Sequence, residues 1–385
     1  MAHVFIVNNQ TFNTHLKYLF AGTGNDKKTD LFYITETDKF NSDKGIETKD
    51  AYTDGNSYAM IADINRVRIG DEVLFYNIST HKFYGVFEIA SKPFFEDVNN
   101  NYLLNELGKN LNFRVLIKPK EIFKKGLRET DALDTIKNID KPYQLCWSLI
   151  YRKLKASRGC SYITNYEFDY LKSLISQENG NQTLTNFTSL SFNEETEEIQ
   201  ANTTPQHSYD VTRTSTFIDV FSRLLTRKNK NFSFESHLQA YVVANIENLN
   251  ILPNSANDIP IAWIGNEVYS SVGEKRIDVL VIQENETDVY LNIIELKDEQ
   301  CKTPIFEQLD YYIKWCSEFV SPNYANKNVH INAIGFGLKY NRKTKSYNSL
   351  ISTLQTKNNP LCDKYYIKEY IIDEANNCLV ITDII

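Results

Sequence analysis

Short apolar segments with two different periods alternate along the chain. Apolar side chains that recur at every second position predict β-strands, and spacings of three and four residues predict helices. In the first half, the predicted strands are 4–7, 31–34, 72–77, 83–95 and 113–117, and the predicted helices are 11–20, 143–155 and 165–176. We therefore expect a small β-rich domain with flanking helices.

The helix at 165–176 has the clearest start signal. Thr164 is followed three residues later by Glu167, which is the spacing of a capping box. Phe168, Leu171, Leu174 and Ile175 then fall on one helical face. This face should pack against the predicted strands.

The second half of the chain shows a different order. A helix at 232–243 precedes two strands at 275–282 and 289–297, and a helix at 304–315 precedes a strand at 330–336; later strands are expected at 365–372 and 378–385. The order of helices and strands predicts a second domain of mixed α/β type.

The segment between the halves is polar and lacks sustained apolar periodicity, although a short strand at 188–192 fits its pattern. Such a composition is typical of a tether. We therefore expect domains at 1–178 and 211–385, joined by an acidic flexible linker at 179–210.

Composition agrees with two folded domains. The chain has 385 residues, of which 42% are hydrophobic and 24% charged, enough for two cores. Its net charge is −7, yet residues 181–210 alone carry −5, and residues 1–180 carry +1. The acidity is therefore concentrated in the middle segment, and it does not exclude nucleic acid as a partner.

No apolar run approaches the roughly 20 residues that span a bilayer, and the start lacks the features of a signal peptide. The six cysteines include no CxxC pair, which favours core residues in a reducing compartment. We expect a cytoplasmic protein with no membrane partner.

Residues 66–76 and 83–89 predict an Ile-Gly-Asp turn, a strand and a Gly-containing antiparallel partner. Together with Arg158-Gly and Ile163–Leu171, this pattern resembles the PUA-like superfamily, particularly its EVE and YTH branches. The resemblance covers about residues 1–176 and implies a β-barrel that binds nucleic acid. In the EVE and YTH branches, an aromatic pocket holds a flipped, modified base.

A flipped base needs aromatic faces above and below it and a polar group at its edge. Tyr76, Trp147 and Tyr33 are the candidates to stack on it, and Asn77 is the candidate to read its edge. The same aromatic side chains also suit a hydrophobic core.

Two basic clusters in this half could bind phosphates. One spans 109–128 and the other 152–158. The candidates for DNA-backbone contacts are Lys118, Lys120, Lys124, Lys125, Arg152, Lys155 and Arg158. Ordinary solvated surface is the alternative for each cluster.

The second half carries candidate catalytic chemistry. Period-2 alternation places Asp278 on one face of its strand and Glu295 and Lys297 on one face of the next. Antiparallel pairing would bring Asp278 toward Glu295. Burying such charges is costly unless they bind something. Mg²⁺, for which Mn²⁺ could substitute, suits carboxylate oxygens and would polarise a phosphate, and Lys297 would stabilise the developing negative charge.

The spacing Asp278-x16-Glu295-x-Lys297 resembles the PD-(D/E)XK nuclease superfamily, over about residues 215–340. Residues 273–280 resemble a strand of NucS-type endonucleases, and Gln308 with Tyr312 resembles a RecB-like helix motif. The resemblance implies a restriction-endonuclease-like αβββαβ core. It also implies Glu235 as a further metal ligand among the catalytic residues, with Glu274 as the alternative ligand. Gln308 is implied as catalytic and Tyr312 as contacting DNA.

These resemblances together imply a modification-dependent restriction endonuclease, in which the first domain reads a base and the second cuts double-stranded DNA. Since each chain offers one such centre, we expect a homodimer. The alternatives are a NucS-like repair nuclease for mismatched or branched DNA and a non-catalytic DNA-binding protein with a degenerate core.

Overall fold

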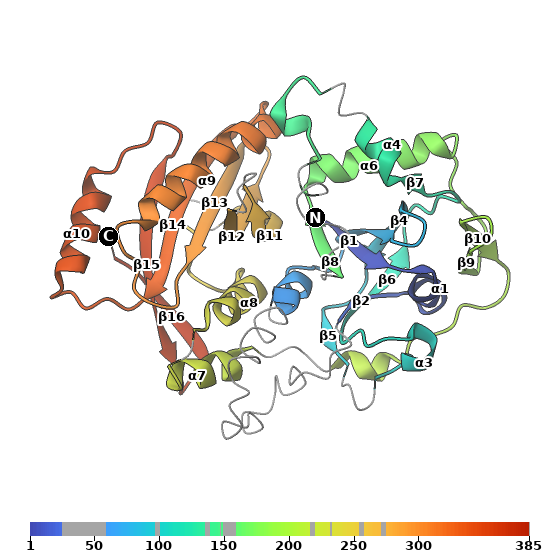
Figure 1. Ribbon diagram of the computed structural model, residues 1–385, viewed down its shortest axis with the longest axis horizontal. Coiled ribbons are helices and arrows are strands. Elements are labelled where there is room, and N and C mark those ends of the chain that lie inside the picture. Colours follow the sequence, from blue (N-terminus) through green and yellow to red (C-terminus); the bar gives the residue numbers. More distant parts are fainter. Residues whose placement is uncertain are drawn as a thin grey trace. The chain divides into compact units, whose positions relative to one another are not determined.

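The computed structural model describes residues 1–24, 59–96, 101–134, 139–146, 148, 159–215, 220–231, 233–253, 258–270 and 275–384. The chain forms two compact units: the described parts of 1–140 and 145–218 make the first, and those of 141–144 and 219–385 the second. Both units mix helices and strands (Figure 1). The strand predicted at 31–34 and most of the helix predicted at 143–155 lie outside the described residues.

The elements of the first unit are β1 (Ala2–Val7), α1 (Asn9–Tyr18), β2 (Phe20–Thr23), β3 (Glu72–Asn77), β4 (Lys82–Ile89), β5 (Phe94–Phe95), α3 (Leu104–Leu107), β6 (Phe113–Pro119), β7 (Leu127–Arg128), α4 (Glu129–Asp134), β8 (Cys160–Ile163), α6 (Asn165–Glu178), β9 (Ser189–Asn193), β10 (Glu198–Asn202) and the 3₁₀ turn η6 (Val211–Ser215). Its main sheet has the order β2-β6-β4-β3-β1-β8, with β5 beside β6 and β7 beside β4. β1 and β3 are parallel. The sheet is curled, because β2, at one end of this order, contacts β1 near the other end.

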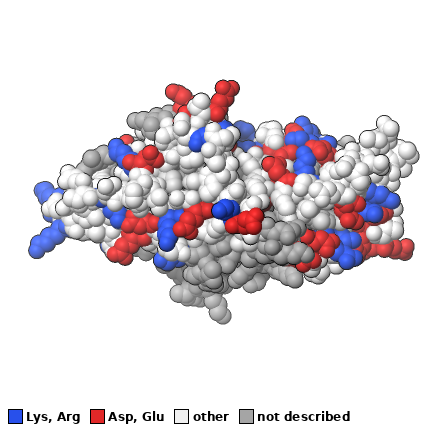
Figure 2. Space-filling model, turned by 90° about the horizontal axis from the view of Figure 1, so that it is seen from above, with Lys and Arg blue, Asp and Glu red and all other residues white. Residues whose placement is uncertain are grey.

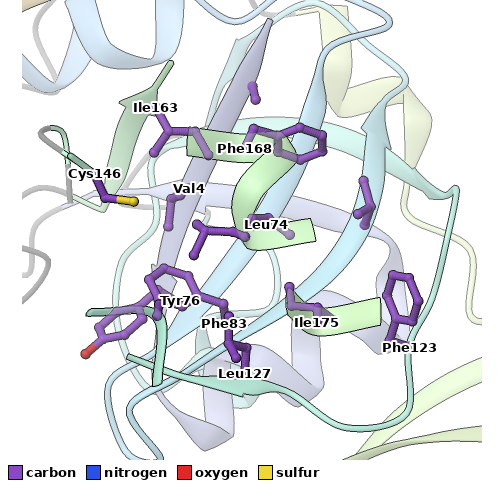
Figure 3. Packing of buried hydrophobic residues seen from close by; sticks show 14 residues of the cluster. Val4, Leu74, Tyr76, Phe83, Phe123, Leu127, Cys146, Ile163, Phe168 and Ile175 are labelled. Carbon is purple, nitrogen blue, oxygen red and sulfur yellow. The ribbon is translucent and has the colours of Figure 1, made fainter. Parts of the chain in front are cut away.

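Helix α6 covers part of this sheet as its pattern predicts. The Thr164 side chain accepts a hydrogen bond from the Glu167 N–H, and the Glu167 carboxylate accepts one from the Thr164 N–H, so the capping box is confirmed. Phe168 and Ile175 pack against residues of β1, β3 and β4 (Figure 3). The capping residues and the apolar face together explain why this segment is helical and where it is anchored.

Residues 179–210 are not a flexible linker, so that prediction is wrong. β9 and β10 form an antiparallel hairpin, and β9 packs against α1. Phe192 lies 5.1 Å from Phe12 and 5.5 Å from Tyr84, measured between ring centroids, and Ile199 is fully buried. A few apolar side chains in a polar segment suffice to attach it to the first unit, whose boundary lies near residue 218 instead of 178.

A buried polar network holds the end of the same segment. The Tyr209 hydroxyl donates to Glu96 Oε1 (2.8 Å), and the Arg213 guanidinium donates to both Glu96 oxygens. The Arg114 guanidinium, which is also fully buried, donates to the Tyr209 hydroxyl (2.8 Å). The Glu96 carboxylate thus compensates the charge of Arg213 directly and is linked to the buried Arg114 guanidinium through the Tyr209 hydroxyl.

The elements of the second unit are the 3₁₀ turn η5 (Pro142–Gln144), α7 (Phe221–Asn229), α8 (Glu235–Asn245), β11 (Ile261–Tyr269), β12 (Arg276–Glu284), β13 (Asp288–Leu296), α9 (Ile305–Phe319), the 3₁₀ turn η8 (Ser321–Tyr324), β14 (Asn328–Leu338), α10 (Lys345–Thr356), β15 (Lys364–Asp373) and β16 (Cys378–Asp383). They form a six-stranded sheet in the order β11-β12-β13-β14-β15-β16. β13, β14 and β15 run parallel, and the other neighbours are antiparallel.

From α8 to β14 the order of elements is αβββαβ, whereas the sequence pattern predicted this order without its first strand. Helix α9 packs on β13 and β14, and α8 contacts β11, β12 and β13. β11 was not located from the sequence, because Gly265, Asn266 and Glu267 interrupt its alternation. Helices α7 and α10 were also missed.

Among the described residues, no helix is both long and apolar enough to cross a bilayer. All six cysteines have free thiols, and four of them are buried (Cys146, Cys160, Cys301 and Cys316).

Candidate active site

Asp278 and Glu295 face each other across two neighbouring strands. β12 and β13 pair antiparallel with Val279 opposite Ile294, so the next pair of positions is Asp278 and Glu295. The Asp278 carboxylate also accepts a hydrogen bond from the Leu296 N–H (2.8 Å). The alternation of the two strands therefore brings these carboxylates together, as predicted.

Lys297 completes the cluster on the same side as Glu295. Its Nζ donates to Glu295 Oε1 at 2.7 Å, and its backbone N–H donates to the Phe336 carbonyl of β14 (2.8 Å). Glu295 is only 3% exposed, and its second oxygen, Oε2, is buried without a hydrogen-bond partner among the described residues. A buried carboxylate oxygen without a partner is costly, and this one lies beside a second carboxylate.

The electrostatics of the cluster reflect crowded negative charge. Burial, followed by the charges of Glu295 and Glu235, raises the pKa of Asp278 well above its usual value. Burial also raises the pKa of Glu295, although Lys297 opposes the shift. The pKa of Lys297 is raised despite its burial, because the charge of Glu295 favours the ammonium form. The cluster therefore favours a bound positive charge.

Helix α8 is attached to this cluster at two points. Its N-cap residue, Phe234, supplies no side-chain cap; instead, Asp298 Oδ2 accepts hydrogen bonds from the Phe234 N–H (2.9 Å) and the Ser233 hydroxyl (2.6 Å). Further along the helix, the Gln239 amide donates to the Asp278 carbonyl (3.0 Å). Asp298 and Gln239 thus fix the helix relative to β12 and to the end of β13.

Removing the cap from α8 should weaken the second unit. We expect Asp298→Ala to lower the free energy of unfolding by about 1 kcal/mol, the usual contribution of an N-cap side chain. Asp298→Asn should retain most of the stability, since its amide oxygen can still accept both hydrogen bonds. Urea denaturation followed by circular dichroism measures the difference, and equal losses in the two variants would contradict the capping role.

Glu235 begins α8 and lies within electrostatic reach of the cluster. Burial raises its pKa, Lys297 opposes this shift, and Asp298 and Glu295 add to it. Tyr312 of α9 is buried at 3% exposure, and its pKa is raised by burial and by the charges of Glu295 and Asp278. Gln308 is half-buried one turn before Tyr312 and forms no hydrogen bond with any residue that the structure describes.

The chemistry of the site fits a hard divalent cation held by two carboxylates. Within the described part of the chain, no three His, Cys, Asp or Glu side chains converge as a metal-binding group, so the predicted three-carboxylate set with Glu235 is not assembled. Mg²⁺ typically uses only one or two protein carboxylates besides water and phosphate. The buried Oε2 of Glu295 and the neighbouring Asp278 carboxylate supply such oxygens. The alternative ligand Glu274 lies outside the described residues.

In the first unit, two of the predicted base-binding residues have structural roles. Tyr76 is fully buried in the core (Figure 3), its hydroxyl donating to Glu129 Oε2 (2.6 Å). Asn77 is also fully buried and donates to Asn9 Oδ1 (2.9 Å). Neither side chain has a face open to a base, which contradicts the prediction for these two residues.

Four of the predicted phosphate contacts of the first unit lie in the described residues, and three of these four pair with acids. Lys118 pairs with Glu88, Lys120 with Glu72 and Lys124 with Glu198, at 2.7–3.1 Å. Lys125 is exposed. Figure 2 likewise shows acidic and basic side chains interspersed on the face in view. The cluster at 109–128 is therefore not an open basic patch.

The remaining candidates lie outside the described residues: Tyr33 and Trp147 for the base, and Arg152, Lys155 and Arg158 for the DNA backbone. Sequence reasoning missed Asp298 and Gln239. Asp298 directly follows Lys297, and this adjacency in the sequence was the only available signal, since the helix that it caps begins 63 residues earlier at Glu235.

Comparisons with known proteins find no family model and no curated protein that matches the chain. Among solved structures, a hypothetical protein from Leishmania major is similar, with 13% sequence identity and a TM-score of 0.29; the match covers 46% of this chain and 95% of that chain. Human THYN1, solved in complex with DNA containing 5-methylcytosine, has 11% identity, with 45% and 96% coverage and a TM-score of 0.26. A Pseudomonas putida protein has 12% identity, with 46% and 99% coverage and a TM-score of 0.27.

Proposed function

We propose that the second unit is a Mg²⁺-dependent nuclease that hydrolyses phosphodiester bonds of double-stranded DNA. One observation carries the proposal: two facing carboxylates, the half-buried Asp278 and the buried Glu295, share a cluster with an ammonium group held at 2.7 Å from Glu295. Its arrangement suits a reaction in which negative charge develops on a phosphate.

The residues of the chain divide the chemical tasks. Asp278 and Glu295 would hold the cation, which when bound polarises the phosphodiester. Glu295 orients the Lys297 ammonium through their hydrogen bond. The raised pKa of Lys297 keeps it protonated at neutral pH, so it can stabilise the pentacoordinate phosphate without first gaining a proton. Tyr312 is buried within electrostatic reach of Glu295 and Asp278.

We further propose that the first unit selects the DNA by reading a modified base, in a restriction enzyme that defends against phage. Support comes from the PUA-like pattern of the sequence and from a curled mixed sheet with its helices. Trp147 and Tyr33 are the aromatic candidates left for the base, since Tyr76 is buried. Cutting both strands would require a homodimer, because the described residues of each chain form one such cluster.

Incubating the full chain with Mg²⁺ and three otherwise identical duplexes tests the proposal. One duplex is unmodified, one contains 5-methylcytosine and one contains 5-hydroxymethylcytosine. We expect cleavage of a modified duplex, at least tenfold faster than that of the unmodified one, and none in the presence of EDTA. Gel electrophoresis of end-labelled strands measures both rates.

Other outcomes of this experiment would indicate a different function. Cleavage confined to mismatched or branched duplexes would replace base reading by a repair role. Binding of DNA without cleavage in Mg²⁺ or Mn²⁺ would indicate a non-catalytic protein and overturn the nuclease proposal.

A further inference from the structure

A short loop of the second unit carries a concentrated positive charge. Residues 339–345, which we call the basic loop, run from the end of β14 to the first residue of α10 and read Lys-Tyr-Asn-Arg-Lys-Thr-Lys. They contain four basic residues and no acid. The side chains of Lys339, Arg342, Lys343 and Lys345 are all exposed.

The basic loop begins at the carboxyl end of β14, beside the carboxyl end of β13, where the candidate active site lies. β13 and β14 are parallel, with Glu295 opposite Gly335 and Leu296 opposite Phe336. The pairing continues beyond β13, because the Leu338 N–H donates to the Glu299 carbonyl (3.0 Å). The chain that leaves β14 therefore starts its loop directly beside the segment that follows Lys297.

Tyr370 of β15 connects the two segments. Its hydroxyl donates to the Lys297 carbonyl (3.1 Å), and its own carbonyl accepts a hydrogen bond from the Lys339 N–H (3.0 Å). One buried side chain thus contacts the backbone at Lys297 while its main chain holds the first residue of the basic loop.

The loop is held in a defined conformation. Glu369, buried at 4% exposure, accepts hydrogen bonds from the Tyr340 N–H (2.9 Å) and the Arg342 guanidinium (2.6 Å). The Gln300 amide donates to the Lys339 carbonyl (2.9 Å). Thr344 caps α10 by accepting from the Tyr347 N–H. Such anchoring lowers the entropy that the loop loses when it binds a partner.

Three of the four basic side chains of the loop form no ion pair with the described residues. Arg342 is neutralised by Glu369, whereas Lys339, Lys343 and Lys345 form no ion pair with any residue that the structure describes. The lysines of the first unit at 118, 120 and 124 differ in this respect, since each pairs with a glutamate. Exposed lysines without acidic neighbours are free to contact phosphates.

We propose that the basic loop binds the phosphate backbone of duplex DNA beside the cleavage position. The inference deepens the proposed function, on which its connection with cleavage rests. Duplex DNA is the partner that fits, because its regularly spaced phosphates match several cations along a fixed loop. The loop would give the second unit affinity for DNA, which the acidic cluster cannot provide because its carboxylates repel phosphates.

The test compares two pairs of exposed lysines in the full chain. Lys339→Ala/Lys343→Ala removes two loop cations. Lys314→Ala/Lys364→Ala is the matched control, since both residues are exposed and lie in the second half of α9 and at the start of β15, away from the ends of β13 and β14. Fluorescence anisotropy with an unmodified duplex in EDTA, at several salt concentrations, gives the dissociation constants.

We expect the loop variant to bind about tenfold more weakly near physiological salt, and its slope of log K against log[salt] to shrink by about 2, or 0.9 per lost contact. The control pair should match the unsubstituted chain. Lys339→Arg/Lys343→Arg should restore binding, because it restores both positive charges.

Unchanged binding in the loop variant, or equal losses in the loop and control pairs, would overturn the inference. Cleavage by the unsubstituted chain in that case leaves the nuclease proposal standing. Conversely, loop-dependent binding by a chain that never cleaves supports the basic loop as a DNA-binding surface and removes only the catalytic proposal.

Discussion

Glu295→Gln should reduce Mg²⁺-dependent DNA cleavage by at least about 100-fold, the upper end of the loss seen when only a supporting residue of a metal site is changed. The amide replaces one of the two facing carboxylates, so the site loses an anionic oxygen while side-chain volume is conserved. Glu295 Oε2 is buried and has no hydrogen-bond partner among the described residues. Single-turnover cleavage at saturating DNA measures the chemical step.

A second readout separates the role of Glu295 from simple loss of activity. Electron paramagnetic resonance of Mn²⁺ should show weaker ion binding in Glu295→Gln, whereas DNA affinity in EDTA should be unchanged. Glu284→Gln is the matched control, because Glu284 ends β12 and pairs with Lys327 at 2.7 Å, away from the cluster. Cleavage by Glu295→Gln at the rate of the control would show that the reaction occurs elsewhere.

Glu96→Ala should cost the first unit about 3–5 kcal/mol, because removal of one partner leaves buried charges without compensation. Glu96 is 1% exposed and accepts hydrogen bonds from Tyr209 and Arg213. Its loss also removes a carboxylate whose charge favours the buried Arg114 guanidinium, which contacts the same Tyr209 hydroxyl.

Urea denaturation with hydrogen exchange measured on peptides assigns this loss to the first unit. Peptides from 101–119 and 203–215 should exchange faster in Glu96→Ala, while peptides of the second unit should be unaffected. Glu72→Gln is the control, since its partner Lys120 is solvent-exposed and such pairs contribute little. Similar urea midpoints for Glu96→Ala and Glu72→Gln would show that the buried network does not hold residues 203–215 on the first unit.

Sequence patterns correctly predicted those elements whose structure is decided by residues close to one another in the sequence. Glu72–Asn77 was predicted with the observed bounds, and the start of α6 followed from Thr164 and Glu167. The facing of Asp278 and Glu295 followed from the period of two and from one hairpin. In each case the deciding contacts lie within a few residues or across one turn.

Features that depend on distant contacts were missed. The alternation of β3 could not tell that Tyr76 is buried, because both faces of a curled sheet can be covered. Phe192 and Ile199 gave too weak a pattern to show that their segment packs against α1. The lysines of the basic loop are readable in the sequence, but their place beside Lys297 depends on the parallel pairing of β13 and β14.

The hairpin of β9 and β10 also decides where the first unit can be separated from the rest of the chain. A fragment that ends near residue 180 lacks the side chains that cover Phe12, Tyr84 and Phe20, namely Phe192 and Tyr209. It would expose an aromatic surface to water and tend to aggregate. A fragment that runs to residue 215 keeps this surface covered, because the polar stretch after residue 178 is itself part of the folded first unit.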